Sequence, residues 1–254
     1  MKHSFIFSLI VLFSWVAMAT ANADNGNDRL IEANTKYTEE DYESAAAIYE
    51  EILQGGESAV IYYNLGNTYY KQGRLGPAIL NYERALLHDP GNEDIQYNLE
   101  MTKNQTIDKF ESVDRFFLLE WIDALRSLCN TNGWAYISII CFIITLILTG
   151  TYIFARIGWL KKVAFFSGIV LFIVTMVAFN FSGNQREKLI AHDHAIIFSP
   201  SVTVKSTPDE SGTELFLLHE GTKVKIKRKL GNWIEIQLED GNVGWISSTE
   251  AESI

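Results

Sequence analysis

Two long apolar runs without any charge, separated by only eight residues, constrain this chain more than any other feature. Trp134 to Phe154 covers 21 residues and Val163 to Phe181 covers 19. A helix rises about 1.5 Å per residue, so each run is long enough to cross the ~30 Å hydrocarbon core of a bilayer. The pattern predicts transmembrane helices at 134–154 and 163–181, paired as a tight hairpin. Buried core helices of a soluble protein are the alternative.

The connection at 155–162 predicts the orientation of this hairpin. It contains Arg156, Lys161 and Lys162 and no acidic residue. Lys and Arg in short loops mark the cytoplasmic side of a membrane. We therefore expect a cytoplasmic loop at 155–162, with both flanking segments on the other side.

The N-terminus predicts the same arrangement. Lys2 precedes an apolar run from Phe5 to Val16, and Ala21-Asn22-Ala23 follows as a cleavage site. This run is too short to span a bilayer, so residues 1–23 are interpreted as a signal peptide. The expected arrangement is two membrane spans, with the N- and C-terminal domains both outside the cytoplasm.

Acidic residues are concentrated in the first of these domains. Residues 24–132 contain 9 Lys and Arg against 20 Asp and Glu, a net charge of −11, whereas the whole chain has −10. Binding to nucleic acid requires an excess of basic residues, so we do not expect a nucleic-acid partner.

Residues 26–104 repeat with a period of 33, since Ala45 aligns with Ala78 and Tyr49 with Tyr82. Small residues at such positions let two antiparallel helices approach closely, and the tyrosines fill the space around them. The second copy resembles the tetratricopeptide pattern, which it matches at Tyr62, Leu65, Gly66, Tyr69, Ala78, Tyr82, Ala85 and Pro90. An all-α superhelix of about two and a half units is expected over 24–110.

Tetratricopeptide arrays bind peptides or proteins on a concave face. The family register assigns seven residues to that face, and aromatic and amide side chains suit a peptide backbone. A purely structural role for the tyrosines, packing the superhelix, is the alternative. The predicted groove residues are Asn34, Tyr37, Tyr63, Asn67, Tyr70, Tyr97 and Met101.

Two shorter segments flank the hairpin. Residues 111–133 are amphipathic and rich in aromatic side chains, which favours a juxtamembrane helix at the lipid interface, or else a linker helix docked on the repeats. Residues 182–194 are predicted to be a linker. His192-Asp193-His194 within it has the residue types of a metal site but lacks a third His or Cys nearby, so no metal is expected.

From residue 195 to 254 the sequence changes to short β-rich runs with turn residues between them, and Asp240-Gly241 is a strong hairpin signal. The segment resembles a bacterial SH3-type domain, an all-β barrel whose relatives bind cell-wall peptides or protein segments. The resemblance rests on Val202-x-Val204-x-Ser206-x-Pro208, Gly221-x-x-Val224, Trp233-x-x-Ile236 and Gly244-Trp245-Ile246.

Two groups in this domain are candidates for contact. Trp233 and Trp245 are assigned to its binding surface, with a core position as the alternative for Trp245. Lys223, Lys225, Lys227 and Lys229 fall on one face of a strand. They form either a solvated edge that discourages aggregation or a docking surface for an acidic domain such as the repeats.

The sequence contains no catalytic signature. Nucleophile-elbow, zinc-protease and phosphate-loop motifs are absent, as is a Cys-x-x-Cys pair. We therefore expect a protein without enzymatic activity, cofactor or metal.

The order of segments resembles the BatE-type aerotolerance proteins, and the resemblance is strongest at residues 92–100 and 200–206. It implies membrane partners with von Willebrand A-type domains, a large exported partner and a MoxR-type ATPase, in an envelope complex linked to oxidative stress. The expected protein is a multidomain membrane-anchored scaffold, with cell-wall (peptidoglycan) sensing or binding through the SH3-type domain as the alternative.

Overall fold

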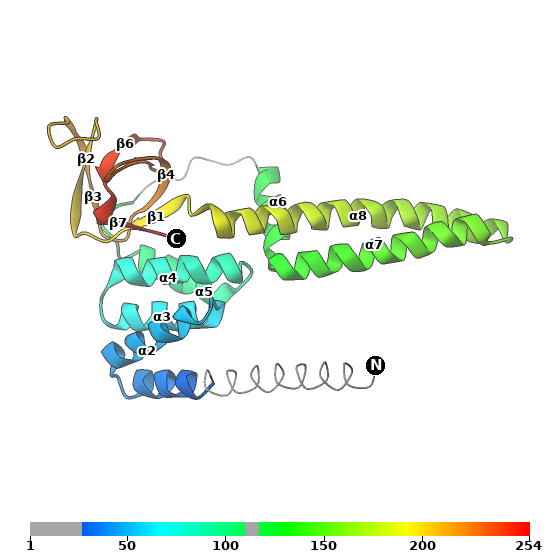
Figure 1. Ribbon diagram of the computed structural model, residues 1–254, viewed down its shortest axis with the longest axis horizontal. Coiled ribbons are helices and arrows are strands. Elements are labelled where there is room, and N and C mark those ends of the chain that lie inside the picture. The colour runs from blue at the N-terminus through cyan, green and yellow to red at the C-terminus, as the bar shows by residue number, and fades with distance from the viewer. Residues whose placement is uncertain (1–26, 110–116) are drawn as a thin grey trace, which may run out of the picture.

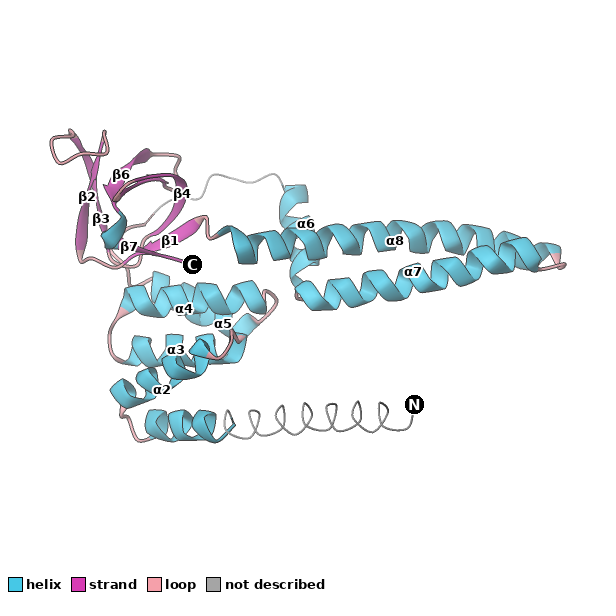
Figure 2. Cartoon of the chain, viewed as in Figure 1, coloured by secondary structure: helices cyan, strands magenta, loops and turns pink. Residues whose placement is uncertain are grey.

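The computed structural model describes residues 27–109 and 117–254. A helical body and a β-barrel lie together at one end of a long two-helix hairpin (Figure 1). Helices and strands are segregated into these parts (Figure 2). The predicted signal peptide at 1–23 and the start of the juxtamembrane segment lie outside the described residues.

The helical body consists of antiparallel helices joined by short turns. Residues 27–38 form its first described helix. In most of the others, buried residues recur three or four positions apart and form one stripe, whereas the helix over 75–88 is buried on nearly all sides. These helices are α2 (Tyr42–Gln54), α3 (Ala59–Lys71), α4 (Leu75–His88) and α5 (Glu93–Lys103).

The period of 33 residues corresponds to one packing unit used twice. The hydroxyl of Tyr49 donates to Asn34 Oδ1 at 2.7 Å, and that of Tyr82 donates to Asn67 Oδ1, also at 2.7 Å. Gly66 lies against the second of these tyrosines, where an added Cβ would come within 2.7 Å of the ring. The small residue is therefore required by a close approach between α3 and α4.

The hairpin consists of α7 (Thr131–Phe154) and α8 (Gly158–Ala191), and both helices are long and apolar enough to cross a membrane. Small and hydroxyl side chains line their contact, as is typical of helices that pack in lipid. Ser138 Oγ donates to the carbonyl oxygen of Thr175 at 3.3 Å, and Ala178 is fully buried nearby.

The ends of α8 differ from the sequence prediction. The helix begins at Gly158, so the connection shortens to 155–157, and it continues through residues 182–191, which were assigned to a linker. Most of the predicted linker is thus helical, because loss of hydrophobicity ends an apolar run but not a helix. Gln, Arg, Glu and Lys are all good helix formers.

A short amphipathic helix, α6 (Phe117–Ser127), lies across the base of the hairpin (Figure 1). Its last turn is fixed to both long helices. Trp134 Nε1 donates to the carbonyl oxygen of Arg126 at 2.8 Å, and Gln185 Nε2 donates to the same oxygen at 2.9 Å.

The C-terminal barrel is an antiparallel seven-stranded sheet in the order β3-β2-β6-β5-β4-β1-β7. The predicted Asp-Gly turn joins β5 and β6, and Gly241 adopts a φ of +91°, which glycine tolerates best. The strands are β1 (His194–Ile197), β2 (Ser201–Lys205), β3 (Glu214–His219), β4 (Lys223–Leu230), β5 (Trp233–Gln237), β6 (Val243–Ser247) and β7 (Ala251–Ser253).

The barrel and the repeats share a core, although they were predicted as separate domains. Ile196 and Ile254 from the barrel are buried among the repeat side chains, and Phe198 packs beside them. Ala195 and Ile197 face the other way, into the barrel core. Strand β1 is therefore buried on both faces, which explains its continuous apolar run.

Candidate functional site

The predicted groove residues have different roles in the structure. Asn34 and Asn67 use their side-chain oxygens to accept from Tyr49 and Tyr82, within the helix pairs. These two amides therefore hold neighbouring helices together, and their carbonyl oxygens are already engaged.

Tyr63 and Tyr70 tie α3 to α5 and to the turn that follows α5. The hydroxyl of Tyr63 accepts from Asn98 Nδ2 at 2.7 Å, and that of Tyr70 accepts from Gln105 Nε2 at 2.6 Å. Both tyrosines are half-buried against the repeat core. This geometry agrees with the alternative in which they pack the superhelix, although part of each ring remains accessible.

Among the large side chains predicted for the groove, Tyr97 on α5 is the most exposed. Tyr97 is 68% exposed, and Met101 is half-buried one turn further along the helix. Tyr37, on the first described helix, packs edge to face on Tyr42 with ring centroids 5.4 Å apart. Burial raises the pKa of Tyr37, and the phenols of Tyr42 and Tyr63 raise it further. This groove phenol therefore stays protonated at neutral pH.

The two tryptophans assigned to the barrel surface differ. Trp233 is half-buried, with Lys205 Nζ 5.7 Å from its ring centroid. Trp245 is only 8% exposed, and the Arg228 guanidinium lies 5.6 Å from its ring centroid. The surface assignment of Trp245 was therefore wrong. Trp245 lies on β6, and Arg228, which reaches over its ring, lies on β4, with β5 between the two strands.

A buried carboxylate joins the two modules. Glu83 on α4 accepts from Lys103 Nζ at 2.6 Å and from Lys223 Nζ at 2.7 Å, and its side chain is 10% exposed. Burial alone raises the pKa of Glu83, but the two ammonium groups outweigh it and lower the pKa to about 2. Lys223 thus docks on the acidic repeats, whereas Lys227 and Lys229 are exposed.

A second carboxylate holds the turn between β3 and β4. Asp108 accepts from the backbone N–H of His219 at 2.7 Å and from Thr222 Oγ1 at 2.6 Å. Burial raises the pKa of Asp108, but the hydrogen bonds from Thr222 and His219 outweigh it and lower the pKa overall. No motif in the sequence points to this residue, which lies 111 positions from its partner.

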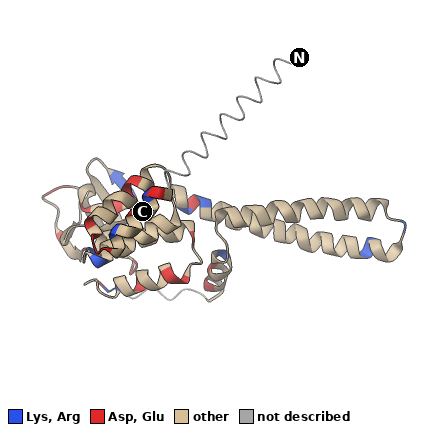
Figure 3. Cartoon of the chain, turned by 90° about the horizontal axis from the view of Figure 1, so that it is seen from below, with Lys and Arg blue, Asp and Glu red and all other residues tan. Residues whose placement is uncertain are grey.

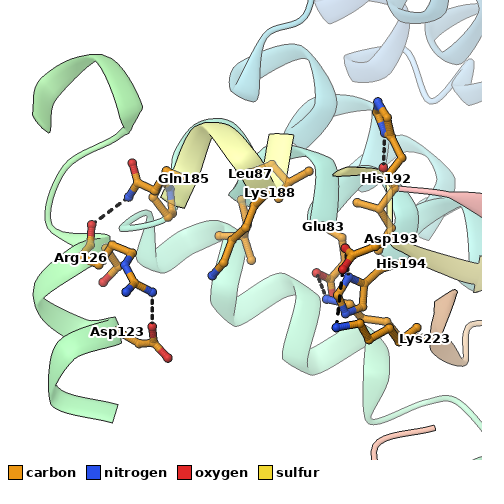
Figure 4. A pocket seen from close by; sticks show the side chains of 15 residues that line it. Glu83, Leu87, Asp123, Arg126, Gln185, Lys188, His192, Asp193, His194 and Lys223 are labelled. Carbon is orange, nitrogen blue, oxygen red and sulfur yellow. Dashed lines mark hydrogen bonds and ion pairs between the residues drawn. The ribbon is translucent and has the colours of Figure 1, made fainter. Parts of the chain in front are cut away.

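A cleft of about 680 Å³ opens where the repeats, α6, α8 and the barrel meet. In Figure 4, Gln185, Arg126 and Asp123 stand on one side of it, Glu83 and Lys223 stand on the other, and Lys188 projects between them. The cleft is lined by Glu83, Leu86, Leu87, Pro90, Asp123, Arg126, Ser127, Gln185, Lys188, His192, Asp193, His194, Lys223, Lys225 and Ile254.

The segment His192-Asp193-His194 forms one wall of this cleft. His192 Nδ1 lies 2.8 Å from the carbonyl oxygen of Ile254, and His194 Nδ1 lies 2.8 Å from Asp193 Oδ1. Within residues 27–109 and 117–254, no group of three or more His, Cys, Asp or Glu side chains is placed to hold a metal ion. These histidines instead join α8 to the barrel, and His192 ends the helix at a φ of +42°.

Comparison with known families supports the two modules separately. Residues 59–92 match the tetratricopeptide repeat family, and residues 200–251 match the bacterial SH3 domain family. No curated protein matches the chain. Both matched families are typically non-catalytic binding modules, and they indicate protein binding or peptidoglycan binding.

Proposed function

We propose that this protein is a non-enzymatic, membrane-anchored adaptor that holds a segment of a partner protein in the groove of its repeats. The observation that carries the proposal is the exposed ring of Tyr97, 68% accessible on α5 of a helical body that is fixed to an apolar hairpin. The resemblance to BatE-type proteins adds the finer proposal of an envelope complex linked to oxidative-stress tolerance, with von Willebrand A-type membrane proteins and a MoxR-type ATPase system as partners.

The proposed location is the inner membrane, with both modules periplasmic. Two features support it. The repeats and the barrel pack together at one end of an antiparallel hairpin, so both must occupy the same side of a membrane (Figure 1). The opposite tip contains Arg156, Lys161 and Lys162, and Figure 3 marks basic residues there in blue on the backbone. Positive charge in a short connection favours the cytoplasm.

Labelling of single cysteines in intact cells tests this orientation. Glu40→Cys, Gly158→Cys and Asp240→Cys would each be placed in a chain carrying Cys129→Ser and Cys141→Ser. A thiol reagent that crosses the outer membrane but not the inner membrane is expected to label positions 40 and 240, and to label position 158 only after lysis. Labelling of 158 with protection of 40 and 240 in intact cells would reverse the proposed orientation.

The groove favours an extended peptide. Protonated phenols and amides offer hydrogen bonds to a peptide backbone, and aromatic rings offer large contact areas at low entropic cost. Tyr97 and Met101 are the best positions to test, because Asn67 and Tyr70 also hold the helices together.

The double variant Tyr97→Ala and Met101→Ala is expected to abolish capture of partner proteins by the full-length chain from detergent-solubilised membranes. Removing a central aromatic anchor typically costs about 2 kcal/mol or more, roughly thirtyfold in affinity. Leu230→Ala is the matched control, since Leu230 is 59% exposed on the barrel. Equal capture by the double variant and the wild type, measured by quantitative mass spectrometry, would rule out the groove as the binding face.

Peptidoglycan binding by the barrel is the second candidate function. The match to the bacterial SH3 family and the partly accessible ring of Trp233 beside Lys205 favour it. If it operates, the solubilised chain co-sediments with purified cell wall, and Trp233→Ala reduces the bound fraction at least tenfold. Absence of the wild-type chain from the pellet would count against this candidate and leave the adaptor role untouched.

A further inference from the structure

Helix α6 exposes one continuous apolar face. Along its 11 residues and just beyond its end, large side chains remain 42–74% exposed, and Trp121 and Leu128 are the most exposed of them at 74% and 70%. The face consists of Phe117, Leu118, Trp121, Ile122, Leu125 and Leu128.

The opposite side of α6 carries polar residues that face the protein, together with Leu119, which is 53% exposed. Asp123, Arg126 and Ser127 line the cleft beneath the repeats and the barrel. Trp121 and Leu125 each lie two residues from Asp123, which places them about 200° around the helix from it. The apolar face therefore points away from the repeats and the barrel, which lie across the cleft from α6.

The anchoring of α6 fixes its level along the hairpin. Arg126 stacks over Phe181, with its guanidinium carbon 5.3 Å from the ring centroid, and Trp134 and Gln185 bind its carbonyl oxygen. Phe181 is the last residue of the apolar run in α8. The helix thus crosses the hairpin where its membrane-compatible stretch ends (Figure 1).

The repeats approach the end of this helix closely. A Cβ added at Gly91 would lie 2.5 Å from the carbonyl oxygen of Ser127, which shows how closely the two backbones approach. This contact holds α6 against the body without covering its apolar side chains. Docking of that face on the repeats, the other expectation from the sequence, is therefore not observed.

We propose that α6 lies in the plane of the membrane, with its apolar face in the leaflet next to the two modules and its polar face forming the floor of the cleft. An interfacial helix of this kind buries its apolar side about 5–10 Å into the boundary between headgroups and acyl chains. With the hairpin as a second anchor, α6 holds the repeats and barrel close to the bilayer in one orientation. The proposal rests on the proposed membrane insertion of the hairpin.

Spin labels on the full-length chain test both proposals separately. Leu125→Cys on the apolar face, Glu120→Cys on the polar side and Ile143→Cys on the lipid side of α7 would each be made with Cys129→Ser and Cys141→Ser. The labelled chains are reconstituted in bilayers of phosphatidylethanolamine and phosphatidylglycerol. Collision with oxygen, which prefers lipid, is compared with collision with a water-soluble nickel complex.

We expect the oxygen-to-nickel ratio at 125 to be several-fold higher than at 120 and to approach that at 143. Equal, water-like ratios at 125 and 120, with a lipid-like ratio at 143, would overturn the interfacial helix alone. A water-like ratio at 143 would instead overturn the insertion of the hairpin. Spin–spin broadening at 125 that persists on dilution into excess lipid would show that a second copy covers the face, which also contradicts the proposal.

Discussion

Replacing Glu83 by glutamine is expected to lower the free energy of unfolding by about 3–5 kcal/mol, because it leaves two partly buried ammonium groups without their counter-charge. Lys103 and Lys223 both bind this carboxylate, and they come from different modules. The loss is measured by urea denaturation of the full chain in mild detergent. Glu210→Gln is the control, since Glu210 pairs with Lys205 but its side chain is 90% exposed. An exposed pair contributes only about 0–1 kcal/mol.

The same substitution should change how stability depends on pH. The pKa of Glu83 is lowered from 4.5 to about 2 in the folded protein. A carboxyl group whose pKa is lower in the folded than in the unfolded protein stabilises the fold at pH values above its unfolded pKa. That stabilisation is lost as the pH falls from about 4.5 towards 2. The difference in the free energy of unfolding between wild type and Glu83→Gln should therefore shrink as the pH falls from about 4.5 towards 2. A constant difference, or a loss no larger than that of Glu210→Gln, would contradict the role assigned to Glu83.

Ile196→Ala is expected to destabilise the protein by about 2–5 kcal/mol, the usual range when a fully buried isoleucine is truncated. Ile196 is 0% exposed and packs in the core of the repeats, although it belongs to the barrel. The loss should appear in both modules at once, as faster amide hydrogen exchange in α4 and in β1.

Leu217→Ala provides the comparison for this prediction. Leu217 lies on the edge strand β3 and is 49% exposed, so its truncation should change stability by only about 0.5 kcal/mol. If Ile196→Ala were equally mild, or if exchange increased in the barrel alone, the shared core between the modules would be disproved.

Much of the architecture was predictable from local pattern. The lengths of the apolar runs indicated two helices able to span a membrane, and both are present. The spacing of Tyr49 and Tyr82 indicated a helical repeat, and the two tyrosines make equivalent hydrogen bonds. Asp240-Gly241 indicated a hairpin, and β5 and β6 are paired across it. Each of these signals arises from residues close together in the chain.

The candidate site was less predictable because chemically similar residues have different surroundings. Ile196 and Ile197 are adjacent isoleucines, yet one packs in the repeats and the other in the barrel. Tyr63 and Tyr97 were assigned to the same groove, but the first is tied to Asn98 while the second is 68% exposed. Hydrophobicity predicts burial, but it does not specify which neighbour provides it.

The sequence alone determined the class of each segment: apolar hairpin, helical repeat and small β-barrel. Only the tertiary structure decided that the repeats and the barrel form one body, that Lys223 binds Glu83 140 positions away, and that α6 turns its apolar face outward. Secondary structure follows from side-chain periodicity over a few turns. Contacts between distant segments depend on where the whole chain brings them, and no local pattern encodes that position.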